Sequence, residues 1–252
     1  MENYLQHEQK IIVTVNDTDF LGQIKPSAIM GYFQDIAVEH AEKIGVGYDV
    51  MRDKNMGWVL IRMSYRIIRN PLIGESLTIK TFPEKPRTAD ANRGYYIYDK
   101  NNNLIILGSS KWCVIDLSTH RLQKCVPLFT RYDDSLFIPS QPFEGANPKL
   151  AEFTSLLENP INFKVNVTDL DRYLHMNNAR YGDVVLNTCG AEMLKNNWIS
   201  SFDANFMSQL FISDIYTAYK EHNGNTTNIE VRKEENNIIA FRAQIVWTPR
   251  SI

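Results

Sequence analysis

The expected fold rests on the stretch Ile12-Val-Thr-Val-Asn-Asp17-Thr-Asp19. Its pattern returns later in the chain as Phe163-Lys-Val-Asn-Val-Thr-Asp169-Leu-Asp171. Asp17 aligns with Asp169, an offset of 152 residues, and at this offset Gln23 aligns with His175. Each copy reads as an alternating strand that leads into an Asp-rich turn. A pattern repeated at such a distance indicates one structural unit that is built twice.

Each Asp-rich turn is followed by an apolar-periodic segment, which predicts helices over residues 27–44 and 178–195. In the first helix the apolar residues recur at spacings of three, four and seven; they are Ile29, Phe33, Ile36, Ala37 and Ile44. Such spacing places them on one face of the helix. This apolar face requires a sheet to cover it.

The sheet is expected downstream of each helix, in segments rich in β-branched and aromatic residues. In the first half these segments are 58–68, 76–82, 93–98 and 104–115, and in the second half 203–207, 215–219, 227–232 and 238–247. The sequence therefore predicts an α+β fold of two tandem hotdog domains, each a long antiparallel β-sheet wrapped around a central α-helix. We expect the domains over 1–130 and 161–252, joined by a linker over 131–160.

The bulk composition is that of an ordinary globular protein. Its 252 residues carry 27 basic and 29 acidic side chains, so no overall field indicates binding to nucleic acid. No apolar run approaches the roughly 18 residues of a membrane-spanning helix, and Met1–Lys10 lacks the order of a secretory signal. Cys113, Cys125 and Cys189 form no CxxC pair, which favours free thiols and a cytoplasmic location. No motif implies a metal or another cofactor.

Residues Asp169-Leu-Asp171-Arg-Tyr173-Leu-His175-Met-Asn177-Asn178-Ala-Arg-Tyr181 resemble the Asp-Leu-Asp-x-Asn-x-His-x-Asn-Asn-x-x-Tyr signature of the acyl-acyl carrier protein (ACP) thioesterases. Trp58–Arg62, Pro71–Gly74 and Ser110–Leu122 are similar to strands of the same family. The resemblance implies two hotdog domains in one chain and hydrolysis of acyl-ACP to free fatty acid, which ends chain elongation. It also implies that the first domain receives the acyl chain, with Trp58 in its substrate-binding lining.

The motif contains groups that thioester hydrolysis needs. His175 is the candidate general base, because imidazole titrates near neutral pH. Asp171, four residues earlier, is expected to orient the imidazole or to act on the water itself. The helix that begins near Asn177 and Asn178 would direct backbone N–H groups at the developing oxyanion, so both asparagines are candidate substrate-binding residues. Asp171 as a helix cap and His175 as a surface side chain are the structural alternative.

Two positions depart from the family pattern. Gln209 stands where the family has glutamate; its amide can hydrogen-bond to a catalytic water but cannot accept the proton. Tyr173 stands where the signature has asparagine, and is expected to orient the substrate through its hydroxyl or to fill space. In the first copy Gln23 replaces the histidine and Lys25-Pro26 replace the paired asparagines, so this half is expected to bind rather than react.

Three alternatives remain open from the residues. The first is an acyl-coenzyme A thioesterase, which uses the same chemistry. The second is a non-hydrolytic acyl-binding protein that has lost activity through Tyr173 and Gln209. The third is a hotdog hydratase, which also uses Asp and His.

Either a monomer or a homodimer is possible, since the chain supplies both hotdog partners. Because ACP is acidic, a basic docking surface is expected from some of Lys80, Lys85, Arg87, Arg93, Lys111, Arg121, Lys124, Lys164, Arg172 and Arg180. His40 is expected on a solvated helix face, and His120 belongs to no motif.

Overall fold

The computed structural model describes residues 5–138, 142–153 and 158–250. The elements of the first half are β1 (His7–Ile12), α1 (Pro26–Lys43), α2 (Tyr48–Asp53), β2 (Met56–Ile67), β3 (Ser76–Pro83), β4 (Ala91–Tyr98), β5 (Leu104–Asp116) and β6 (Leu122–Gln123). Those of the second half are β7 (Glu158–Lys164), α3 (Arg180–Cys189), α4 (Ala191–Asn196), β8 (Asn197–Phe206), β9 (Ile215–Asn223), β10 (Thr226–Lys233) and β11 (Ile239–Pro249). Short 3₁₀ turns cover Val15–Asp17, Val126–Leu128, Asp134–Leu136 and Val167–Asp169.

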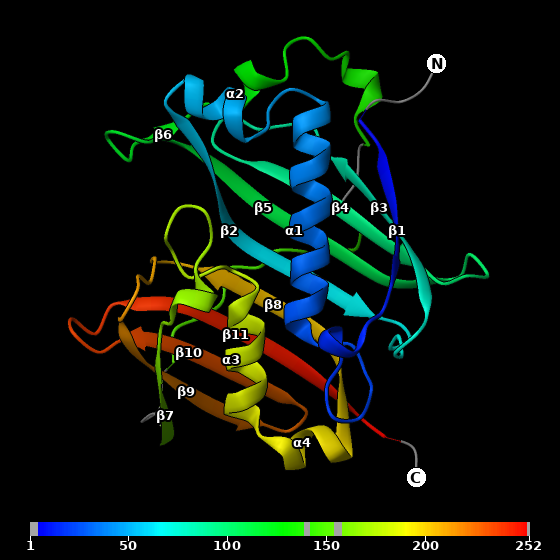
Figure 1. Cartoon of the computed structure of the whole chain (residues 1–252), viewed down its shortest axis with the longest axis vertical. Coiled ribbons are helices and arrows are strands. Elements are labelled where there is room, and N and C mark those ends of the chain that lie inside the picture. The colour runs from blue at the N-terminus through cyan, green and yellow to red at the C-terminus, as the bar shows by residue number, and fades with distance from the viewer. Residues whose placement is uncertain (1–4, 139–141, 154–157, 251–252) are drawn as a thin grey trace.

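One antiparallel sheet runs through the whole molecule (Figure 1), in the strand order β1-β3-β4-β5-β2-β8-β11-β10-β9-β7, with β6 added beside β5. The two halves join where β2 pairs with β8, for example Met63 opposite Ala204 and Tyr65 opposite Phe202. α1 crosses the first half of the sheet and α3 crosses the second. The expected architecture of two tandem hotdog units is confirmed, and their sheets are continuous.

The second helix is shorter than expected. The segment 178–195 was predicted as one helix, whereas α3 ends at Cys189 and the separate helix α4 begins at Ala191. Gly190 lies between them at a φ of 86°, in the left-handed region that only glycine adopts without strain. The single glycine therefore ends the helix, and α4 leads directly into β8.

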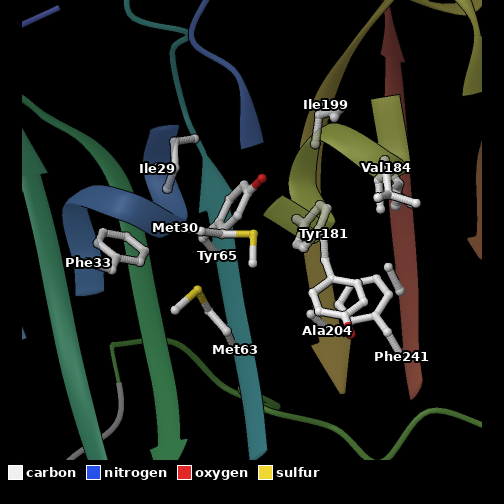
Figure 2. Packing of buried hydrophobic residues seen from close by; sticks show 14 of the residues in the cluster. Ile29, Met30, Phe33, Met63, Tyr65, Tyr181, Val184, Ile199, Ala204 and Phe241 are labelled. Carbon is white, nitrogen blue, oxygen red and sulfur yellow. The ribbon is translucent and has the colours of Figure 1, made fainter. Parts of the chain in front are cut away.

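The largest hydrophobic cluster among the described residues extends through both halves. Ile29, Met30 and Phe33 of α1 face Met63 and Tyr65 of β2 on one side, while Tyr181 and Val184 of α3 lie with Ile199, Ala204 and Phe241 on the other (Figure 2). The ring of Tyr65 stacks on that of Phe202 with centroids 4.9 Å apart, directly across the β2–β8 junction. Burial of these aromatic side chains couples the two halves.

The two central helices meet near their N-terminal ends. Gly182 of α3 lies so close to α1 that a Cβ atom there would be 2.4 Å from the backbone nitrogen of Ser27. The Ser27 hydroxyl donates a hydrogen bond of 2.5 Å to Oδ1 of Asp183 on α3. This contact places the turns that precede α1 and α3 in a fixed relation to each other.

The prediction for His40 was wrong. Its side chain is only 1% exposed. Its Nδ1 lies 2.9 Å from Nη1 of Arg93, whose side chain is also buried. The neighbouring Glu39 and Glu42 suggested a solvated position, but His40 follows Ile36 by four residues and so lies on the buried face of α1. No helix of the described residues is long and apolar enough to cross a membrane.

Candidate active site

The motif loop before α3 is a tight turn built on the carboxylate of Asp171. Oδ1 of Asp171 accepts backbone hydrogen bonds from Tyr173 (2.8 Å) and His175 (3.2 Å), and the Asp171 N–H donates to the His175 carbonyl at 2.8 Å. Leu174 closes the turn at a φ of 63°. Asp171 therefore shapes the loop, and the hydrogen bond to the imidazole that we expected is not among those of the described residues.

The first half contains the same turn without the chemistry. Oδ1 of Asp19 accepts from the backbone of Leu21 (2.8 Å) and of Gln23 (3.1 Å), and Gly22 takes the position of Leu174 at a φ of 73°. The aspartate is thus a turn residue in both halves. The second half has the imidazole of His175 where the first half has the amide of Gln23.

The imidazole of His175 is half-buried against aromatic rings. Phe211 contacts it edge-to-face with centroids 4.9 Å apart, and the ring of Tyr173 lies nearly parallel to it at 6.5 Å. Burial lowers the pKa of His175; the nearby charge of Asp171 opposes this shift and His120 adds to it. A lowered pKa keeps the imidazole neutral at physiological pH, which is the form that accepts a proton.

The paired asparagines precede α3 and differ in their hydrogen bonds. Oδ1 of Asn177 accepts from the N–H of Ala179 at 2.9 Å, and the Asn177 N–H donates to the Asp169 carbonyl at 2.8 Å. The backbone N–H of Asn178 has no acceptor within the described part of the chain. At the equivalent position the first half has Pro26, which has no N–H at all. At this position only the second half therefore has a backbone donor.

Gln209 lies next to the strand segment that pairs with the motif loop. The carbonyl of the following residue, Leu210, accepts from the Met176 N–H at 2.8 Å. The Gln209 side chain is exposed and makes no hydrogen bond to other described residues. In the first half the residue at the same place is Asn70, whose Nδ2 donates to Oε1 of Gln23 at 2.9 Å. By the internal symmetry, Gln209 occupies the position that Asn70 has next to Gln23.

The first half of the chain contributes two groups to these surroundings that the sequence did not indicate, Tyr48 and His120. Tyr48, the first residue of α2, places its ring 5.4 Å from that of Tyr173. The guanidinium of Arg172 lies 4.1 Å from the centroid of the Tyr48 ring. His120, in the turn between β5 and β6, acts electrostatically on His175. None of these contacts follows from a motif, because each depends on how the two halves meet.

The equivalent cleft beside Gln23 is lined by groups from both halves of the chain. Nη2 of Arg250 donates to Oε1 of Gln23 at 2.9 Å, where Asn70 also donates. The cleft is lined by Asp19 and Trp198 as well. Trp198 stands near the start of β8 as Trp58 stands near the start of β2. This half has no acid–base pair on the motif turn.

Trp58 lies at the end of the first-half core. Its indole N–H donates to the Val46 carbonyl at 2.9 Å, and its ring is 6.3 Å from that of Phe129. Among the described residues Trp58 makes no hydrogen bond or ring contact with the motif loop, so its role in substrate binding stays a prediction. Within the same residues no cluster of His, Cys, Asp and Glu is arranged to hold a metal ion.

Comparison with known proteins identifies the two halves. The family model of the acyl-ACP thioesterase N-terminal domain matches residues 4–131, and that of the acyl-ACP thioesterase C-terminal domain matches residues 157–249. An oleoyl-acyl carrier protein thioesterase of Coriandrum sativum is 25% identical over 229 residues, which are 85% of this chain and 62% of the relative. An Arabidopsis thaliana oleoyl-acyl carrier protein thioesterase is 26% identical over 77% of this chain and 57% of its own length. The chain thus spans about three fifths of these curated relatives.

Solved structures share the fold over nearly the whole chain. An acyl-ACP thioesterase from Bacteroides thetaiotaomicron superposes with a TM-score of 0.87 at 19% identity, covering 98% of this chain and 100% of the other. A 12:0-ACP thioesterase from Umbellularia californica gives 0.85 at 17% identity, with 98% of each chain covered. With both halves of the chain matched in order by the two domain models, this protein belongs to the acyl-ACP thioesterase family.

Proposed function

We propose that the protein hydrolyses acyl-ACP thioesters and releases free fatty acid, with residues 161–252 as the catalytic domain and 1–130 as the acyl-binding domain. The observation that carries this proposal is the pairing, on one loop, of a half-buried His175 with the free backbone N–H of Asn178. A neutral imidazole and an oxyanion donor are the two groups that water needs to attack a thioester. The first-half copy has neither.

His175 takes a proton from water as the water oxygen attacks the thioester carbonyl carbon. The negative charge that develops on the carbonyl oxygen is stabilised by the Asn178 N–H and by the positive end of the α3 dipole. The tetrahedral intermediate then expels the carrier thiolate, which receives the proton from the imidazolium. Asp171 stabilises the imidazolium through its charge, and Gln209 orients the water by a hydrogen bond. The products are the free acid and the carrier thiol.

The acyl chain is proposed to enter the first half from the motif loop. Trp198 lines the cleft beside Gln23, so the internal symmetry supports a lining role for Trp58 beside His175. Tyr173 and Asn177 would then contact the substrate near its carbonyl. Metal and other cofactors have no part in this proposal.

The carrier is proposed to dock near the motif loop through exposed cations. Arg172 and Arg121 are both exposed, and neither has an ion-pair partner among the described residues. Arg121 follows His120 directly in the chain, so both cations belong to the surroundings of His175.

Because β2 and β8 already pair the two hotdog units, we propose that a monomer is sufficient. Three buried free cysteines favour a cytoplasmic location.

The test is thiol release from acyl-ACP of several chain lengths by the wild type, by His175→Ala and by His222→Ala as a matched control. His222 lies on β9, where its Nδ1 contacts the Thr227 hydroxyl at 2.8 Å. Loss of the general base is expected to slow release on the order of 10²-fold or more, whereas the control stays active. Equal or faster turnover of acyl-coenzyme A would remove ACP as the carrier. Saturable acyl binding without thiol release would establish the acyl-binding alternative, and a hydroxyacyl thioester product would establish the hydratase.

A further inference from the structure

Three rings from the two halves of the chain lie in a row that ends at His175. The Tyr48 and Tyr173 centroids are 5.4 Å apart with their planes tilted by 60°. The Tyr173 and His175 centroids are 6.5 Å apart with planes only 15° from parallel. Tyr48 belongs to the first half, and the other two belong to the motif loop. The row therefore connects the first half of the chain to the imidazole of the second half.

Tyr48 is itself held firmly. Its backbone N–H donates to Oε1 of Glu42 at 2.7 Å, which fixes the start of α2 against the end of α1. The guanidinium groups of Arg172 and Arg52 lie 4.1 Å and 5.6 Å from the centroid of its ring. Cations over the face of a tyrosine ring restrict where the ring lies. A ring fixed in this way can hold the side chain that packs against it.

The imidazole needs such support because the carboxylate of the motif does not supply it. Within the described residues, the hydrogen bonds to the Asp171 carboxylate all come from backbone N–H groups, so they fix the loop backbone and do not orient the His175 ring. Among the described residues the contacts that restrict the ring are aromatic, from Tyr173 and from Phe211. Tyr173 also replaces the asparagine that the family signature has at this position.

We propose that Tyr48 is a positioning residue for His175 and acts through the stacked ring of Tyr173. This inference rests on the proposed function, because it assigns His175 the role of general base. Tyr48 touches neither the water nor the thioester in this proposal. It holds Tyr173 over the imidazole, which restricts the ring and limits its contact with water.

Removal of the Tyr48 ring is expected to change His175 in a defined direction. Asp171 on the same loop and His120 on the turn after β5 are the titratable groups that act on His175, and Arg172 and Arg52 lie on Tyr48. In Tyr48→Leu the ring of Tyr173 loses its support and water gains access to the imidazole. The pKa of His175 then rises toward its ordinary value, since burial is the main cause that lowers it.

The experiment compares Tyr48→Leu with the conservative Tyr48→Phe, which keeps the ring and its cation contacts. Tyr219→Leu is the matched control, because Tyr219 is a half-buried tyrosine with the guanidinium of Arg232 at 6.0 Å, on the strand β9. NMR titration of the His175 ring, assigned with His175→Ala, measures the pKa without any substrate. Turnover of acyl-ACP measures kcat and KM separately. A chain that hydrolyses nothing would therefore still test the positioning role.

Tyr48→Leu is expected to raise the His175 pKa and to lower kcat by about 2- to 10-fold, the effect of losing one aromatic contact. Tyr48→Phe and Tyr219→Leu should match the wild type in both measurements. In a Tyr173→Asn background, Tyr48→Leu should add no further change, because the intervening ring is already gone. An unchanged His175 pKa in Tyr48→Leu, or an additional effect in the Tyr173→Asn background, would overturn the proposal. A change confined to KM would overturn it too, since Tyr48 would then contact the substrate directly.

Discussion

The close approach of α1 and α3 makes a sharp test of how the two motif turns are held. Replacement of Gly182 by alanine puts a Cβ atom 2.4 Å from the Ser27 nitrogen and 2.8 Å from its Cα. Ordinary contact begins near 3.4 Å, so the helices must separate by about 1 Å. The obstacle is backbone, which cannot rotate away. We expect an overpacking cost of about 3 kcal/mol, reduced by about 1 kcal/mol for the better helix propensity of alanine.

Gly31→Ala is the matched control on the partner helix. Gly31 lies within α1, and a Cβ atom there would meet nothing within 4 Å. Only the helix propensity then changes, so the free energy of unfolding should rise by about 1 kcal/mol. Thermal unfolding followed by circular dichroism should raise the Tm by about 2–4 °C for Gly31→Ala and lower it by about 4–8 °C for Gly182→Ala. A Gly182→Ala variant that melts at or above the wild type would refute the helix contact described above.

Three further outcomes concern the proposed active site. Burial lowers the pKa of His175, and only the neutral imidazole accepts a proton. In a pH–rate profile, kcat/KM should therefore fall as the pH drops through a midpoint below the ordinary histidine pKa of about 6.5. Asp171→Asn keeps an oxygen for the two backbone hydrogen bonds, so it should lower kcat with little change in Tm. Asp171→Ala should lower both kcat and Tm. A loss of Tm in Asp171→Asn equal to that in Asp171→Ala would contradict the electrostatic role. Gln209→Glu restores the residue typical of the family. It should move the acid limb of the pH–rate profile to higher pH, since a carboxylate beside the imidazole raises the pKa of His175. An acid limb that does not move would place Gln209 away from His175.

Local pattern was sufficient for the elements of the fold. Strand alternation and helix periodicity follow from the geometry of each element, so they were readable before any tertiary contact was known. The repeat of Asp19 at Asp171 also predicted that the two halves would carry the same turn, and the hydrogen bonds of both turns agree. The break at Gly190 was missed because one glycine does not reveal from sequence whether it bends, ends or merely weakens a helix.

By itself the sequence determined the duplicated hotdog architecture, the acyl-ACP thioesterase family and the loop that carries His175, because these depend on residues close together in the chain. Only the tertiary structure decided what surrounds that histidine. Tyr48 and His120 come from the first half, more than 50 residues before His175, and they reach it because β2 pairs with β8. The pKa of His175 depends on burial and on charges from separate segments, and no local pattern encodes how those segments pack.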